Sequence, residues 1–185
     1  MATSEEIFRE AVALPHDERA DLTDRLVASL VDDIPPEITT AQLAEVRRRI
    51  AQVDSGEVKL VPGDEVLARV RRLLVEHTPS SKRMASYGFH SEAADEYLAA
   101  TRYYLDHASP LVAAAFVAEI EAAINTLLAS PTTWPVIEEP EIRRYLLRRF
   151  PYSLYYRWES EVDRVSIYAV MHYSRLPGYW QHRVT

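Results

Sequence analysis

A change of hydrophobic periodicity at Ser130-Pro131 constrains the fold of this chain more than any other feature. Before this point, apolar residues recur at helical spacing between 112 and 128, which predicts the buried side of a helix. After it, apolar and polar residues alternate in three runs, at 143–150, 153–158 and 162–173. Such runs are typical of strands that face a core on one side, and the short turns between them predict an antiparallel meander.

The residues before the meander complete a layered α+β fold. An alternating run over 85–90 predicts a first strand, Ser91 is placed to cap a helix that runs to about Leu105, and a second helix occupies 110–129. Two helices packed on an antiparallel sheet cover one of its faces. We therefore expect the opposite face of this sheet to be available to a partner.

The sequence of the first half of the chain instead predicts short amphipathic helices. Helical spacing of apolar residues predicts helices over about 4–12, 16–29, 40–53 and 64–74. Pro35-Pro36 breaks the chain between the second and third of these helices, and alternating Val58 to Val61 predicts one short strand. Pieces of this size bury only a modest core, so this all-α part is expected to need a partner to fold fully.

A polar stretch separates the two halves. Residues 78–83 contain proline and no apolar residue, which is the composition of a linker. Met84 follows directly, at the point where the pattern changes, and we interpret it as a second start codon; an ordinary methionine in a loop is the alternative. The predicted organisation is a domain at 1–77, a linker at 78–83 and a second domain at 84–185.

Composition excludes several classes of protein and site. The chain has no cysteine, so it has no disulfide scaffold, thiolate zinc site or cysteine nucleophile. Its six histidines form no HExxH motif or close pair, and we predict no metal and no cofactor. No apolar run approaches the roughly 20 residues that span a bilayer, and the acidic N-terminus lacks the features of a secretory signal. We therefore expect a cytoplasmic protein that does not contact a membrane.

Charge is distributed unevenly along the second half. The net charge of the chain is -7, which argues against a wholly basic nucleic-acid binder. From Ala85 to Ile142 the only lysine or arginine is Arg102, whereas from Arg143 to the end the arginines outnumber the acids. This reversal is compatible with a cationic surface for phosphates or an acidic partner, or with arginines that pair with the upstream acids.

Several motifs carry a family resemblance. The run Ala13 to Leu22, with Leu26 to Leu30, Gly56-Glu57-Val58 and Pro62 to Leu67, resembles the addiction-module antitoxin family. Members of that family are small helical proteins encoded beside RelE/ParE-type toxins. Independently, Arg143 to Arg157, Asp163 to Val165 and Ala169 to Trp180 resemble the RelE/ParE toxin family. The two motifs occur in operon order across a linker and a methionine.

The resemblance implies a type II toxin–antitoxin fusion. The antitoxin helices, with the strand near Val58 to Val61, would be laid onto the toxin and would prevent it from inhibiting growth. At about 3.4 Å per residue the linker spans at most roughly 24 Å, so the antitoxin would dock within its own chain or by exchange in a homodimer. Antitoxins often repress their own operon, and Arg47-Arg48-Arg49 would contact operator DNA or form a solvated helix face.

The resemblance leaves the toxin target open, because RelE-like members cut mRNA in the ribosome whereas ParE-like members poison DNA gyrase. Cutting RNA requires a base or orienting group, cations for the transition state and an acid for the leaving oxygen. The candidates for these roles are His172, Arg175, Arg149 and Tyr173. On a strand, Arg148 and Arg149 would point to opposite faces, so both cannot address one site.

The set of nuclease residues is incomplete. Ser153 stands where an arginine commonly follows the strand tyrosine of RelE-like toxins, and Trp180 stands where some relatives have a tyrosine. We accordingly keep three hypotheses: a ribosome-dependent mRNA endoribonuclease, a non-enzymatic inhibitor of DNA gyrase, and an inert fusion that is permanently neutralised. Tyr152, Tyr155, Tyr156 and Tyr173 are expected to lie in the core or an interface rather than to stack on bases.

Overall fold

The structure is a computed structural model that describes residues 2–15, 18–19, 21–23, 25–26, 29, 34–74, 86–173 and 175–177. The predicted linker 78–83, Met84, Trp180 and much of the predicted helix 16–29 lie outside these residues. Elements with bounds in the described part of the N-terminal segment, up to Leu74, are α1 (Ser4–Ala13), α3 (Pro36–Asp54), β1 (Val61–Pro62) and α4 (Gly63–Leu73). The C-terminal domain, from Ser86, contains β2 (Ser86–Phe89), α5 (Ser91–His107), α6 (Pro110–Ala129), β3 (Val136–Glu138), β4 (Ile142–Leu146), β5 (Tyr152–Glu159), a short 3-10 turn η1 (Ser160–Val162) and β6 (Arg164–His172).

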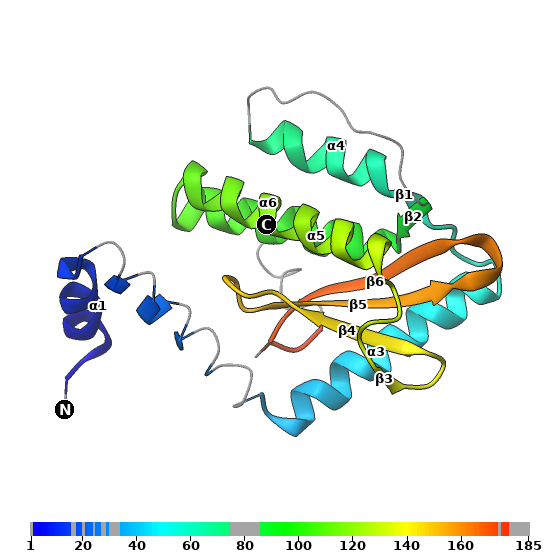
Figure 1. The fold of residues 1–185 in the computed structure, drawn as a ribbon, viewed down its shortest axis with the longest axis horizontal. Coiled ribbons are helices and arrows are strands. Elements are labelled where there is room, and N and C mark those ends of the chain that lie inside the picture. Colours follow the sequence, from blue (N-terminus) through cyan, green and yellow to red (C-terminus); the bar gives the residue numbers. More distant parts are fainter. Residues whose placement is uncertain are drawn as a thin grey trace.

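The six strands form a single sheet in the order β1-β2-β6-β5-β4-β3 (Figure 1). Strands β4 to β6 form the predicted antiparallel meander, β3 adds a strand that was not predicted, and β2 pairs in parallel with β6. On the far side of β2, Val61 and Pro62 of β1 pair antiparallel with Phe89 and Gly88. The N-terminal segment therefore supplies one edge strand of the sheet.

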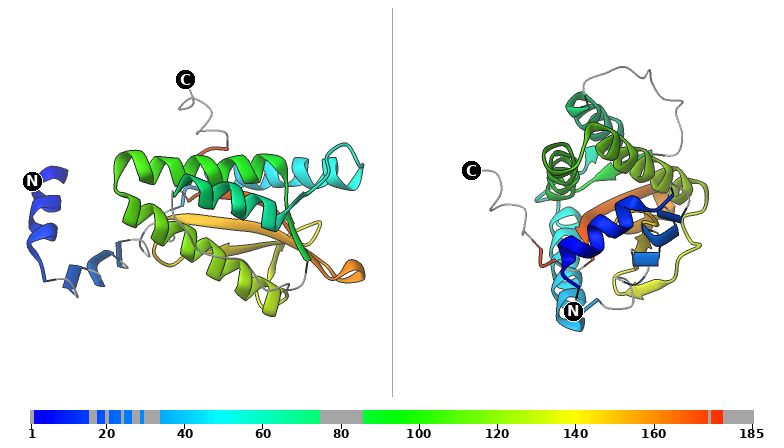
Figure 2. Two further views of the ribbon diagram at one scale, coloured as in Figure 1. Left: turned by 90° about the horizontal axis from the view of Figure 1, so that it is seen from above. Right: turned by 90° about the vertical axis from the view of Figure 1, so that its left-hand side faces the viewer.

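Helices cover both faces of the sheet (Figures 1 and 2). Helices α5 and α6 lie on one face, where they and α4 enclose the larger core with residues such as Phe116, Ile120 and Leu154. Helix α3 lies on the opposite face and encloses a second, smaller core around Val46 and Ile50. The predicted α+β fold of two helices on a largely antiparallel sheet is confirmed, and the face that these helices leave open is covered by α3.

Local details differ from the sequence-based expectations. Arg148 and Arg149 lie in the exposed bend between β4 and β5 and not on a strand, so the argument that they must point to opposite faces is wrong. Their backbone N–H groups both donate to Oε1 of Glu119, at 2.7 and 2.9 Å. The α5 cap is His90 rather than Ser91, and its side chain accepts a hydrogen bond from the Glu92 N–H.

Helix α6 requires a correction to the statement that no apolar run is long enough to span a membrane. Of the helices in the described residues, α6 is the one that is long and apolar enough to do so by length and composition. Its residues Phe116, Ile120 and Ile124 are nevertheless buried in the larger core. We therefore interpret α6 as a core helix whose high apolar content reflects its contact with α5 and the sheet.

The junction between β1 and α4 depends on a glycine. A Cβ atom at Gly63 would overlap the ring of Tyr87, whose hydroxyl donates to Asp64 at 3.4 Å. Replacing Gly63 with alanine must displace that ring from the start of α4. We expect Gly63→Ala to lower the free energy of unfolding by about 1–3 kcal/mol, as measured by urea denaturation. An unchanged midpoint would show that Tyr87 moves aside at no cost.

Candidate functional site

One contact between the two halves is made by α3, which packs on the sheet. Its buried residues Val46 and Ile50 pack against Tyr155, Tyr168 and Met171, which line the face opposite α5 and α6. These positions are those that helical spacing predicts to be apolar, and the predicted helix 40–53 is confirmed with an earlier start at Pro36. The apolar side of α3 thus replaces water over the otherwise open face of the C-terminal domain.

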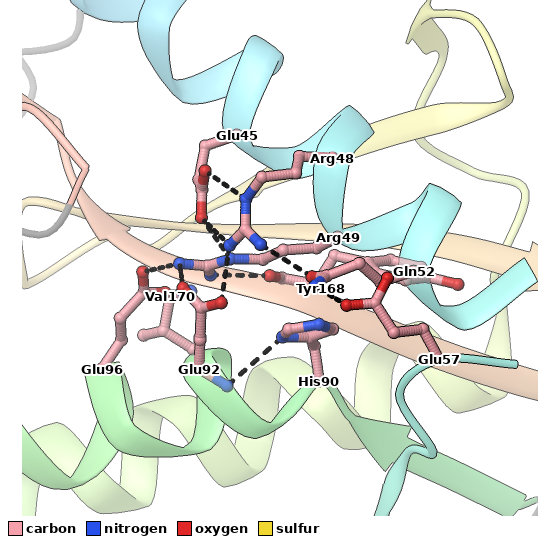
Figure 3. Close-up of polar contacts among 10 residues, drawn as sticks. All are labelled: Glu45, Arg48, Arg49, Gln52, Glu57, His90, Glu92, Glu96, Tyr168 and Val170. Carbon is pink, nitrogen blue, oxygen red and sulfur yellow. Dashed lines mark hydrogen bonds and ion pairs between the residues drawn. The ribbon is translucent and has the colours of Figure 1, made fainter. Parts of the chain in front are cut away.

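A buried ion pair connects α3 with α5 (Figure 3). The guanidinium of Arg49, which is 1% exposed, donates from Nη2 to Oε1 of Glu96 at 2.7 Å and from Nη1 to the Tyr168 carbonyl at 2.9 Å. The other oxygen of Glu96 accepts from the Val170 N–H at 2.9 Å. Two side chains, one from each half, therefore satisfy backbone groups of the same strand.

The length of β2 explains why β6 needs these contacts. β2 pairs with β6 as far as Phe89 and Ile167, and the His90 N–H donates to the Ile167 carbonyl at 2.9 Å. Beyond this point the chain turns into α5, whereas β6 continues to His172. Because buried backbone groups require partners, Arg49 and Glu96 take the place of the missing part of the neighbouring strand.

Electrostatics make each member of the pair depend on the other. Burial raises the pKa of Glu96, because its carboxyl is shielded from water. Burial alone would lower the pKa of Arg49, but the carboxylates of Glu96, Glu92 and Glu45 outweigh it, and the pKa of the guanidinium is raised. Hydrogen bonding to Arg48 lowers the pKa of Glu45 to about 2 against the effect of burial. Arg48 and Arg49 of α3, together with the carboxylates that they bind, therefore form one charged network.

Gln42 makes a second buried polar contact, at the C-terminal end of β6. Its Nε2 donates to the carbonyls of His172 and Arg175 at 2.9 and 2.8 Å, and its Oε1 accepts from the Tyr155 hydroxyl at 2.9 Å. The side chain is 2% exposed. Every polar atom of this amide group is thereby engaged, which fixes the N-terminal half of α3 over the end of the strand.

More exposed ion pairs surround these buried contacts. Arg157 of β5 holds Asp54 at the end of α3 through two hydrogen bonds of 2.8 and 2.5 Å. Arg47 pairs with Glu138 of β3. On the other side of the molecule, Arg71 of α4 binds Glu121 of α6 at 2.9 and 2.8 Å. Exposed pairs of this kind contribute little stability each, roughly 0–1 kcal/mol, but they restrict the register of the two halves.

The arginine run of α3 is only partly a solvated face, because Arg47 and Arg48 are exposed whereas Arg49 is buried. Arg49 is buried, Arg48 binds Glu45 and Glu92, and Arg47 binds Glu138. All three side chains point toward partners within the chain. The expectation of a fully solvated run overlooked acids on α5 and β3, which lie far away in the sequence, and contact with operator DNA stays a prediction.

The four predicted catalytic residues lie at one end of the sheet but in different environments. His172 pairs with Tyr152 in the sheet register and is half-buried, and Arg175 is exposed. Arg149 is exposed in the bend that precedes Tyr152. Tyr173 is buried, and its hydroxyl donates to the Leu147 carbonyl at 2.7 Å. This contact ties the end of β6 to the β4–β5 bend and gives Tyr173 a structural role in this conformation.

Sequence reasoning missed Gln42, Arg49 and Glu96 as interface residues. Glu96 occupies a position between the buried Ala93 and Ala100 on α5, so a charge on the apolar side of that helix was a usable signal. Gln42 carries no such signal, because a polar residue near the start of an amphipathic helix is ordinarily exposed. Its function follows only from the position of β6 beneath it.

His90 gives the interface a dependence on pH. Burial of the ring, together with the positive charge of Arg49, lowers the pKa of His90 from 6.5 to about 4. Between these values the unfolded chain binds a proton that the folded chain does not, so stability is full above about pH 6.5 and falls as the pH decreases. We expect a loss of about 2–3 kcal/mol between pH 6.5 and 4 in urea unfolding experiments.

The variant His90→Asn keeps a cap acceptor and removes the titrating ring. Its unfolding free energy should fall less steeply over the same pH range than that of the parent protein. Parallel pH profiles for the two proteins would contradict the assignment to His90.

Comparison with known proteins finds two separate family matches. Residues 13–66 match the family described as "Putative addiction module component", and residues 87–177 match the family described as "ParE toxin of type II toxin-antitoxin system, parDE". One similar solved structure is titled "Chromosomal ParDE TA system from P. aeruginosa"; it is 23% identical, covers 48% of this chain and 96% of its own, and has a TM-score of 0.42. No curated protein matches this chain. The contacts of Gln42, Arg49 and Asp54 join the two matched regions.

Proposed function

We propose that this chain, which is an addiction-module antitoxin domain fused to a ParE toxin domain, is a growth-inhibiting toxin held inactive by the antitoxin in the same molecule. The observation that carries the proposal is the position of α3. It covers the sheet face that the toxin helices leave open and satisfies backbone groups of β6 through Gln42 and Arg49. A toxin surface covered in this way is closed to any target.

Docking of the antitoxin domain on the toxin domain of its own chain is simpler than exchange between two chains. Helix α3, strand β1 and helix α4 all contact the toxin domain of the same molecule. The predicted exchange between two chains, the homodimer and the contact with operator DNA stay predictions, as do the domain limits 1–77 and 84–185. We place the action of the protein in the cytoplasm, where ribosomes and DNA gyrase are found.

For the target, we favour a non-enzymatic inhibitor of a protein such as DNA gyrase. Tyr173, one of the four candidate catalytic residues, is buried and bound to a backbone carbonyl, and Ser153 occupies the place of a missing arginine. Ribosome-dependent mRNA cleavage is the second candidate, because His172, Arg149 and Arg175 gather at one end of the sheet. An inert fusion is the third.

Induced expression in bacteria tests the proposal. Residues 84–185 expressed alone should stop growth, and the whole chain from the same promoter should not. Loss of DNA supercoiling with intact mRNA would support the gyrase target, whereas ribosome-dependent mRNA cleavage that is lost in His172→Ala would support the nuclease. Normal growth with a soluble, folded fragment would overturn both and leave the inert fusion.

A further inference from the structure

The outer edge of β6 is a row of backbone groups without a neighbouring strand. We call residues 168–172 of this strand the β6 edge. β2 ends where Phe89 pairs with Ile167, and the next residue, His90, makes the last backbone contact from that side. The β6 edge continues past this point to His172 and lies beneath α3. In any conformation without α3, the Tyr168 and His172 carbonyls of this edge would be open to a new partner, whereas the Val170 N–H would still have Glu96 of α5 beside it.

Side chains now satisfy this edge. Arg49 binds the Tyr168 carbonyl, Glu96 binds the Val170 N–H, and Gln42 binds the His172 carbonyl. The three groups are two residues apart in sequence, so they point to the same side of β6. Two of the three partners belong to the antitoxin domain. The antitoxin therefore occupies positions at which an added strand would form its hydrogen bonds.

The charges at this edge specify what such a strand must carry. Among the described residues, the ion pairs of Glu92 and Glu96 come from Arg48 and Arg49 of α3. Without α3, two toxin carboxylates would stand at the edge with no cation. His90 lies beside them, and its buried Nε2 has no hydrogen-bond partner among the described residues. Two carboxylates repel the phosphates of a nucleic acid and attract a basic side chain.

We propose that the toxin recognises its target protein at the β6 edge, by pairing with an extended segment that carries an arginine or lysine opposite Glu96. The antitoxin prevents this because Gln42 and Arg49 occupy the same backbone and carboxylate groups. Addition of a strand to a sheet edge is a recurrent mode of peptide binding, in which main-chain hydrogen bonds give affinity and side chains give specificity. The inference rests on the proposed function, since it identifies the surface on which the toxin acts.

A peptide-binding measurement on the whole chain tests this inference. The double variant Gln42→Ala/Arg49→Ala opens the edge, and amide hydrogen exchange over residues 168–172 verifies that it is open. The probes are two labelled peptides of alternating valine and threonine, one with a central arginine and one with a central glutamate. We expect the opened chain to bind the arginine peptide at least about tenfold more tightly than the glutamate peptide, and about tenfold more tightly than the parent chain does.

Two further substitutions in the opened chain test whether Glu96 causes the preference for the arginine peptide. Glu96→Gln keeps an acceptor for Val170 but removes the charge, and should abolish the preference for the arginine peptide. Glu121→Gln alters a carboxylate of α6 that binds Arg71 away from the edge, and should retain the preference. Where the double variant keeps the edge protected from exchange, Ile50→Asp is used to displace α3 instead.

An open edge that binds neither peptide, or that binds both equally, overturns the inference. This failure is distinguishable from failure of the proposed function, which is read from growth. An opened chain that stops growth but shows no arginine preference would retain the toxin and reject the β6 edge as its binding surface. An opened chain that permits growth would reject the proposed function itself.

Discussion

Replacing Arg49 with methionine is expected to lower the free energy of unfolding of the whole chain by about 3–5 kcal/mol. The substitution keeps much of the side-chain volume but leaves Glu96, which is 3% exposed, without its cation. It also removes the donor to the Tyr168 carbonyl. Breaking a buried pair from one side is costly because the remaining charge is neither solvated nor compensated. Urea denaturation followed by circular dichroism measures the loss.

Matched variants separate the buried pair from the surface pairs. Arg47→Met removes a half-exposed arginine from the same helix and should cost at most about 1 kcal/mol. In Arg49→Met/Glu96→Gln the uncompensated charge is also removed, and much of the lost stability should return. A cost below about 1 kcal/mol for Arg49→Met would mean that Glu96 is neutral in the parent protein.

Replacing Ile50 with aspartate is expected to displace α3 and release the toxin. Ile50 is 2% exposed and packs in the smaller core with Tyr155, Tyr168 and Met171. An aspartate at this position would place an uncompensated charge among apolar groups, at a cost of at least about 4 kcal/mol. This cost acts directly against the docking of α3, because leaving the sheet returns the aspartate to water. Induced expression of this variant should therefore stop bacterial growth, as the isolated toxin domain should.

The control is Ala51→Asp, which places the same charge on the exposed side of α3 one residue further along. Bacteria that express this variant should grow like those that express the parent chain. Growth arrest by both variants would point to a general effect of charge on α3. Normal growth with Ile50→Asp, together with hydrogen exchange showing that α3 has left the sheet, would show that α3 does not restrain the toxin.

Periodicity predicted α6 and the strands β4 to β6, whose apolar residues recur at the spacing of a helix and of strands. The sheet face opposite α5 and α6 was expected to be available from the same pattern. The laying of helices onto it was expected from the family resemblance. Tyr152, Tyr155, Tyr156 and Tyr173 are all buried, as predicted for core or interface residues.

Periodicity could not predict the contacts between distant parts of the chain. The side of β6 that lacks a neighbour becomes visible only when the length of β2 is known, and Arg49 was therefore interpreted from its charge alone. Strand β3 is three residues long and contains a register shift, so it gives no alternating signal. β1 comprises Val61 and Pro62, so Val61 is the one residue that it shares with the predicted strand Val58 to Val61.

A sheet to which both domains contribute strands has a consequence for regulation. Separate antitoxin and toxin chains associate in proportion to their concentrations, so dilution or unequal synthesis changes the free fraction of toxin. Here α3 and β1 belong to the same molecule as the sheet they cover, and docking is a unimolecular equilibrium. If docking is worth about 5.5 kcal/mol, roughly one molecule in 10,000 is open at any time, whatever the number of copies in the cell. A change in the chain itself, such as cutting or loss of α3, would alter that fraction, as would a fall in pH that protonates His90.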